Sequence, residues 1–260
     1  MADFVKEREI DYREHSALNQ STFKDFLKDP YVFMAGVEKE RTSAMDFGTL
    51  CHDMILSIGD VESKYHFAKE KLDFRKKEHK ELKAKVEAEN KILVSQDDWL
   101  RAEALKMQNS DIITTLFADP QNRAELSVYG KLFEVDCKGR CDYVNENQGV
   151  VYDLKITNNS SPTEFKKRFI SFRYDIQAAW YLMLTGLERF VILAISAEAP
   201  YMSAIYEIDS ETIKNATAQI ERGIEMWQNK TKYQSQLYRD FNGDDIITLT
   251  MPDFVYNSIF

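Results

Sequence analysis

The pattern of apolar positions predicts helices in the first half of the chain. A polar start at 19–22 followed by Phe23, Phe26 and Leu27 predicts a capped helix, which 29–30 ends after about two turns. Between Ala44 and Ile58, apolar residues recur at helical spacing, and this segment is expected to be a buried helix. Gly48 within it is expected to permit a close approach to a partner that the sequence does not identify.

Charged residues dominate the next stretch, 62–91, where Lys and Glu alternate with few apolar anchors. That composition is typical of a solvated helix or a mobile arm, and it argues against a second hydrophobic core. Ser95 then caps a predicted helix that runs to Met107, and a further helical piece is predicted for 111–117.

Strands follow, with a helix between them and another after them. Alternation of apolar and polar residues predicts strands at 125–135, 138–144, 150–156, 190–196 and 202–208. Helices are predicted at 173–184 and 211–227. The order of these elements predicts an α/β (mixed α+β) fold with helices packed on a central sheet, as a single domain over 1–260.

Composition narrows the class of protein. The chain has 260 residues, 44% of them hydrophobic, and only 9 Gly and 5 Pro, as expected for an ordered globular protein. No apolar run is long enough for a membrane helix and the charged N-terminus does not resemble a signal peptide, so we expect a cytoplasmic protein. A net charge of −9 gives no general attraction to nucleic acid, so any DNA contact must use local basic patches or metal ions.

Three cysteines, Cys51, Cys137 and Cys141, are too few for a four-cysteine metal site. We expect Cys137 and Cys141 to be small buried residues in a reducing compartment.

The candidate chemistry lies on two predicted strands. Side chains alternate along a strand, so Asp153 and Lys155 share one face while Leu154 points to the other. Asp142 on the preceding strand would complete a pair of carboxylates, which are ligands that Mg²⁺ or Mn²⁺ prefers. Lys155 could orient or help deprotonate a water near such an ion, which is the minimum for phosphodiester hydrolysis. The spacing alone is more often that of a surface ion pair at a strand end.

Two further features bear on this interpretation. His52 lies on the predicted buried helix, where it is either a satisfied core histidine or a neutral imidazole that completes a metal site. Tyr174, Gln177 and Tyr181 form one stripe of a helix. Such a stripe usually packs in a core, but a glutamine between two tyrosines also suits contact with a phosphate or a base.

Four motifs in this order resemble the PD-(D/E)xK nuclease superfamily, specifically its RecB-like branch and the RecE (exodeoxyribonuclease VIII) type found in phages. The match extends from about Leu18 to Pro252. The motifs are Phe47-Gly48-Thr49-Leu50-Cys51-His52, Gly139-Arg140-Cys141-Asp142, Asp153-Leu154-Lys155-Ile156-Thr157 and Tyr174-Asp175-Ile176-Gln177-Ala178-Ala179-Trp180-Tyr181.

The resemblance implies a restriction-endonuclease-like core, a central mixed sheet flanked by helices, that binds one or two Mg²⁺ or Mn²⁺ ions. It implies that His52, Asp142, Asp153 and the backbone carbonyl of Leu154 are metal ligands and that Lys155 is the catalytic lysine. Gln177 and Tyr181 match a family helix beside the scissile phosphate. Glu125 matches an acidic position of uncertain role, and a surface glutamate there is equally compatible.

Some positions depart from the family pattern. Cys141 replaces the proline that gives the superfamily its name, but that proline supplies no ligand. Asp153 stands where many relatives have Glu. The chain also lacks the cluster-forming cysteines of some RecB-like relatives, and it has no P-loop with which to drive unwinding.

A RecE-like resemblance implies an exonuclease that degrades one strand of linear double-stranded DNA from 5′ to 3′ in a bacterial or phage-infected cell. The 3′ overhangs that remain would pass to a single-strand annealing protein, and a ring-shaped homo-oligomer is expected. Two alternatives are a non-enzymatic DNA-binding or assembly subunit with the same fold and a structure-specific endonuclease of the superfamily.

A basic cluster follows the strand that carries Asp153 and Lys155. It could guide the DNA, or it could be no more than a solubilising loop. Its members are Lys166, Lys167, Arg168 and Arg173.

Overall fold

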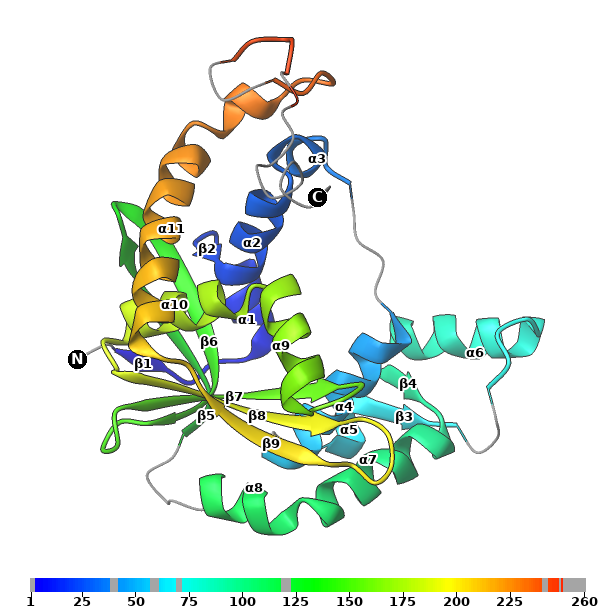
Figure 1. Cartoon of the computed structure of the whole chain (residues 1–260). Coiled ribbons are helices and arrows are strands. Elements are labelled where there is room, and N and C mark those ends of the chain that lie inside the picture. The colour runs from blue at the N-terminus through cyan, green and yellow to red at the C-terminus, as the bar shows by residue number, and fades with distance from the viewer. Residues whose placement is uncertain are drawn as a thin grey trace, which may run out of the picture.

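The computed structural model describes residues 3–37, 42–56, 61–68, 72–117, 123–239, 243–247 and 249. Within these residues the centre is a seven-stranded sheet in the order β1-β5-β6-β7-β8-β9, with β2 paired to β6 outside that path (Figure 1). The strands are β1 (Phe4–Val5), β2 (Leu18–Asn19), β5 (Arg123–Leu132), β6 (Val135–Asn145), β7 (Val150–Thr157), β8 (Arg189–Ser196) and β9 (Ser203–Glu207).

The sheet is mixed, as the sequence predicted. β5, β6 and β7 form an antiparallel meander, β7 and β8 run parallel, and β9 returns antiparallel to β8. The parallel pair needs a crossover, which two helices supply, α9 (Pro162–Ser171) and α10 (Tyr174–Thr185). The candidate residues of β7 therefore lie on a central strand with a neighbour on each side.

Two groups of helices cover the two faces of the sheet. The first group packs against Val151 and Ile192 and includes α2 (Gln20–Lys28), α9, α10 and α11 (Ser210–Gln228). The second group packs against Leu154 and Leu193 and includes α4 (Ser43–Leu56), α7 (Gln96–Gln108) and α8 (Ser110–Phe117). Alternation along β7 thus places Tyr152 and Leu154 on the α4 side, as the period of two requires.

Smaller elements complete the described chain. They are α1 (Glu9–Glu14), α3 (Pro30–Met34), α5 (Val61–Lys64), α6 (Lys77–Ala88), the 3₁₀ helix η1 (Lys230–Tyr233) and a two-stranded parallel sheet of β3 (Tyr65–Phe67) and β4 (Ile92–Val94).

The helix caps expected from the sequence are present. Asn19 accepts a hydrogen bond from the backbone of Thr22 at 2.9 Å, and Ser95 accepts one from Asp98 at 3.1 Å. Asp29 ends α2 and at once caps α3 by accepting from the backbone three residues later at 3.0 Å.

The charged range 62–91 contains more ordered structure than a solvated arm. Tyr65 in β3 is 1% exposed, and α6 buries Val86 and His79. β3 pairs with β4 and packs with α4 and α7, so this segment extends the core on that side of the sheet. Residues 69–71 lie outside the described residues.

Three other details bear on the surroundings of the sheet. A Cβ on Gly48 would meet no protein atom within 4 Å, so the described chain makes no close approach at this glycine, which instead lines a cavity. The basic residues of 166–168 lie on α9 and not in a loop. Part of the tail beyond Lys230 packs on the helices, since the Tyr233 ring lies 5.7 Å from that of Phe26.

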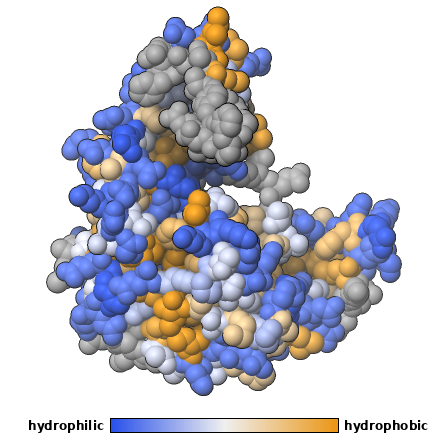
Figure 2. Space-filling view, in the orientation of Figure 1, coloured by the Kyte–Doolittle hydropathy of each residue, from blue (hydrophilic) through white to orange (hydrophobic). Residues whose placement is uncertain are grey.

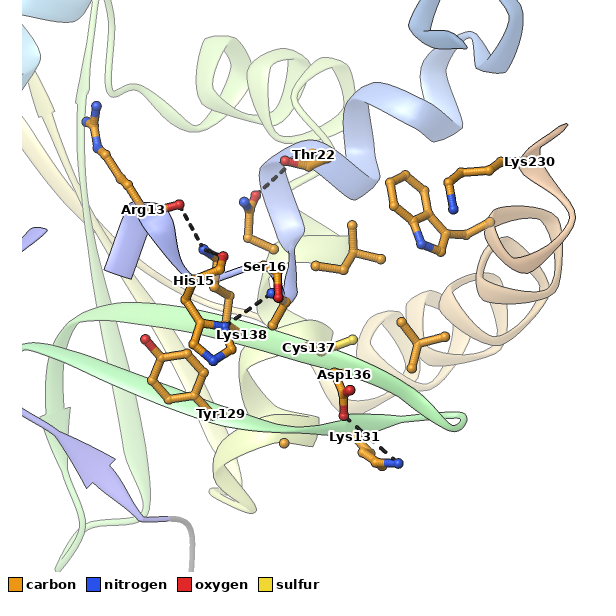
Figure 3. A pocket seen from close by; sticks show the side chains of 16 residues that line it. Arg13, His15, Ser16, Thr22, Tyr129, Lys131, Asp136, Cys137, Lys138 and Lys230 are labelled. Atoms are coloured by element: carbon orange, nitrogen blue, oxygen red, sulfur yellow. Dashed lines mark hydrogen bonds and ion pairs between the residues drawn. The ribbon is translucent and has the colours of Figure 1, made fainter. Parts of the chain in front are cut away.

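A buried lysine holds the N-terminal segment against the sheet. Lys138 of β6 is 2% exposed, and its ammonium donates hydrogen bonds to the carbonyls of Tyr12 at 2.5 Å and His15 at 2.6 Å. This contact fixes the turn between α1 and β2, and it thereby sets where α2 begins. Lys138 also lines a cavity of about 970 Å³. Figure 3 shows it beside His15 and Ser16, with Arg13, Tyr129, Lys131 and Lys230 among the other labelled residues of the cavity.

The face shown in Figure 2 is largely hydrophilic, with hydrophobic side chains scattered among polar ones. Among the described helices, none is both long enough and apolar enough to cross a bilayer.

Candidate active site

The site lies where β6 and β7 stop pairing. Their last pair is Tyr143 with Tyr152, and the next positions along the two strands are Asp142 and Asp153. Here the backbone N–H of Leu154 donates to Asp142 Oδ2 at 2.8 Å. The Asp142 side chain thus takes the place of a β6 carbonyl as the acceptor for the Leu154 N–H. Both carboxylates, Asp142 and Asp153, lie where β6 and β7 separate.

Asp153 is 2% exposed and is held from two sides. Lys155 Nζ lies 2.6 Å from Asp153 Oδ2, and the Gln177 amide of α10 donates to Asp153 Oδ1 at 2.6 Å. Asp153 Oδ2 accepts no hydrogen bond of good geometry within the described part of the chain, so the Lys155 ion pair is its only partner there. The shared strand face expected for Asp153 and Lys155 is therefore present, and α10 supports it.

His52 reaches the same place from α4. Its Nδ1 lies 3.6 Å from Asp142 Oδ2. Burial, reinforced by the charge of Lys155, lowers the pKa of His52 to about 4, although Asp153, Asp53 and a hydrogen bond to the Leu154 backbone oppose the shift. The imidazole is therefore neutral near pH 7, which is the form that binds metals.

The carboxylates and the lysine form one electrostatic unit. Burial and the neighbouring charge of Asp153 raise the pKa of Asp142 well above its usual value, although Lys155 opposes the shift. Burial would lower the pKa of Lys155, but Asp153 and Asp142 outweigh it and the pKa rises. The buried carboxylate of Asp153 and the partly buried one of Asp142 both interact with one ammonium here, so a further cation would relieve their repulsion.

The side chains of this site are of the chemical types that bind a hard divalent cation. It brings together two carboxylates and a neutral imidazole that interacts with the Leu154 backbone, and one carboxylate oxygen lacks a hydrogen bond. Among the described residues, however, no three His, Cys, Asp or Glu side chains lie in an arrangement that would hold an ion as they stand. Asp142 and Asp153 are turned toward protein partners, so the residues that could hold a metal are present but engaged with one another.

A cavity of about 1130 Å³ opens beside this unit. His52, Lys155 and Gln177 line it, together with residues of α1 and α2 and the chain before α1. His52 and Lys155 are therefore reachable from a space large enough for a nucleotide-sized group, whereas Asp142 and Asp153 lie next to them and do not line it.

Glu125 also lines this cavity, at the position of β5 opposite Asp142, where β5 and β6 interrupt their pairing. Glu125 has φ +54°, and its carboxylate accepts a hydrogen bond from Arg140 Nε. Glu125 is thus an ion-paired member of the cavity wall, 17% exposed, and not a free surface residue.

The tyrosines of the α10 stripe differ in their surroundings. Tyr181 is 6% exposed, and its hydroxyl donates to the Arg140 carbonyl at 2.9 Å, so it packs against β6 and does not line the cavity. Tyr174 lines the cavity, with Lys155 Nζ 5.0 Å from its ring centre. The structure therefore brings Tyr174 and Gln177 to the cavity and leaves Tyr181 in the core.

The four residues of the predicted basic cluster make different contacts and do not form one patch at the cavity. Lys167 pairs with Glu164 at 2.6 Å, and Arg173 pairs with Asp175 at 2.9 Å. Arg168 lies over the ring of a neighbouring phenylalanine at 4.9 Å, and Lys166 is exposed on α9. None of the four lines the cavity, so any contact they make with DNA lies outside it.

Two residues of the site, Lys24 and Asp53, are not among those that the sequence motifs indicated. Lys24 of α2 lines the cavity, as does Asp53, which is 4% exposed and pairs with Lys64 at 2.6 Å. Asp53 directly follows His52 in an apolar helix, and a buried acid next to a candidate ligand is a usable signal. Lys24 is distant from Lys155 in the sequence, and only the fold brings the two near each other.

Comparisons with known proteins bear on the family and the fold. Residues 19–236 match the family described as a PDDEXK-like domain of unknown function (DUF3799). No curated protein matches the chain.

Solved structures give a second comparison. The protein named "Putative exonuclease" from Eubacterium rectale is 13% identical, with a TM-score of 0.61 over 98% of this chain and 100% of that chain. At this identity the likeness shows the fold alone. A phage related exonuclease from Haemophilus somnus 129PT is 11% identical over 85% of this chain and 99% of that chain, and its TM-score of 0.36 is too low to support an argument.

Proposed function

Because the chain belongs to the PDDEXK-like family, we propose that it is a metal-dependent DNA exonuclease that hydrolyses phosphodiester bonds of linear double-stranded DNA. The observation that carries the proposal is the meeting of Asp142, Asp153, Lys155 and His52 beside one cavity. These residues come from three elements, and packing alone does not require a buried and a partly buried carboxylate side by side.

His52, Asp142, Asp153 and the Leu154 carbonyl would hold a Mg²⁺ or Mn²⁺ ion. When bound, such an ion activates water and stabilises the negative charge that develops on the phosphate. Lys155 is held beside the carboxylates, where its ammonium can orient the attacking water. Gln177 fixes the rotation of the Asp153 carboxylate, and neutral His52 adds no positive charge that would repel the ion.

The finer features of the proposal come from the RecE-like motifs. They are 5′ to 3′ polarity, 3′ overhangs passed to a single-strand annealing protein, and a ring-shaped homo-oligomer. The same site also suits a structure-specific endonuclease, because the chemistry at the phosphate is the same.

Digestion of an end-labelled linear duplex beside a covalently closed circle, with Mg²⁺, Mn²⁺ or EDTA, tests the proposal. We expect the linear duplex to be degraded only with metal and the circle to persist. Cleavage of the circle would favour an endonuclease. Binding without cleavage under every metal condition would favour a non-enzymatic DNA-binding subunit.

A further inference from the structure

Lys24 is a second lysine at the cavity, contributed by α2. Its Nζ lies 5.8 Å from the centre of the Tyr174 ring, and Lys155 Nζ lies 5.0 Å from the same centre. Lys24 also donates a hydrogen bond to the Phe172 carbonyl at 3.2 Å, which ties α2 to the junction of α9 and α10. The two lysines therefore approach one aromatic ring from different elements.

The two ammonium groups differ in how their charge is balanced. Lys155 is ion-paired with Asp153 at 2.6 Å. Lys24 has no ion-paired carboxylate within the residues that the structure describes, and its one hydrogen bond goes to a neutral carbonyl. Burial and the charge of Lys155 lower the pKa of Lys24 to about 8, although the charges of Asp153, Asp25 and Asp175 oppose the shift, so the side chain is still mostly charged at pH 7. A positive charge beside a cavity that is not held in an ion pair is a site where an anion can bind.

We propose that Lys24 binds a phosphate of the DNA strand whose scissile phosphate lies at Lys155. This inference rests on the proposed function and extends it, since it names a residue that positions the substrate. Gln20 and Ser21, one turn earlier on α2, line the same cavity and present polar groups beside Lys24. The α2 face thus offers the strand a charge-assisted contact with hydrogen-bonding neighbours.

DNA binding measured without cleavage tests this role. Binding of the full chain to a fluorescein-labelled duplex with a single-stranded end is followed by anisotropy in EDTA, between about 50 and 200 mM salt. We expect Lys24→Met to weaken binding about tenfold and to reduce the slope of log K against log salt by about 0.7 to 0.9, as one lost phosphate contact predicts. Lys24→Arg, which keeps the charge, should retain most of the affinity.

Lys28→Met is the matched control, because Lys28 is exposed one turn later on α2 and does not line the cavity. If Lys24→Met behaves like Lys28→Met, the inference is wrong while the proposed function stands. If Lys24→Met and Lys24→Arg lose affinity equally without a change of salt slope, Lys24 acts only through its Phe172 contact and the inference is wrong. A wild-type chain that neither binds nor cleaves DNA would overturn the proposed function as well.

Discussion

The Gln177 side chain donates a hydrogen bond of 2.6 Å to Asp153. From the sequence, Gln177 is predicted to act on the substrate and not on the metal, and that prediction stays untested. The contact shows that the amide is also placed to orient a candidate metal ligand.

We therefore expect Gln177→Ala to weaken Mn²⁺ binding about 10- to 100-fold, as the loss of a residue that orients a ligand does. Isothermal titration calorimetry measures the affinity, and thermal unfolding checks the fold. Unchanged Mn²⁺ affinity with impaired DNA binding would instead support the assignment made from the sequence.

Lys155→Ala is expected to reduce cleavage by about a hundredfold or more, because the water loses the group that orients it. Asp153→Asn should be similarly inactive, since it removes a carboxylate that would hold the ion. Cleavage of a labelled duplex measures both. Full activity in Asp153→Asn would contradict the assignment of this site.

The low pKa of His52 predicts a pH dependence of stability. The folded pKa is about 4 against an ordinary value of 6.5, so the unfolded chain binds more protons between these values. Above pH 6.5 the imidazole is neutral in both states and costs no stability, whereas stability falls as pH decreases from 6.5 toward 4. We expect the free energy of unfolding of wild type to lose up to about 3 kcal/mol more than that of His52→Gln over this window. Urea denaturation in EDTA at pH values across this window tests this, and parallel curves for the two proteins would refute it.

Gly139 is expected to tolerate no side chain. A Cβ there would lie 2.7 Å from the Tyr181 ring, which is itself buried. Gly139→Ala should destabilise the protein by about 1 to 3 kcal/mol through overpacking. Gly48→Ala is the control, since nothing lies within 4 Å and alanine favours a helix, so stability should be equal or higher. Chemical denaturation of both variants provides the measurement.

The hairpin between β5 and β6 offers a stabilising change. Phe133 and Glu134 form its two-residue turn with φ of +49° and +67°, a conformation that favours Asn and Gly. Replacing them with Asn and Gly should raise the free energy of unfolding by about 1 kcal/mol. A lower denaturation midpoint would show that contacts of Phe133 outweigh the backbone strain.

The same turn shows what the sequence could and could not predict. Apolar alternation correctly predicted β7, and polar residues before apolar runs predicted the helix caps, because these features depend on neighbouring residues. Phe133 and Glu134 carry no turn signature, so Val135 was predicted to end one strand when it begins the next. The pairing of β5 with β6, which places Leu132 opposite Val135, puts the turn on residues that do not favour it.

The candidate site likewise has a part that could be predicted from the sequence and a part that could not. The motifs located Asp142, Asp153 and Lys155, whose relation depends on strand register. They did not indicate Lys24, whose place beside Tyr174 depends on the packing of α2 against α10. Nor did they indicate the pairing of Glu125 with Arg140, which depends on the register of β5 and β6 and so on the turn that the sequence did not predict.

The pairing of β2 with β6 has a consequence for the order of events during synthesis. Leu18 pairs with Cys137, in the second half of the chain, so the segment that leads into α2 has no strand to join until β6 exists. Gln177 must follow later still before Asp153 gains its second partner. Contacts between such distant segments are typical of slow folding. A nascent chain therefore carries most of its length out of the ribosome before the parts of the cavity can meet.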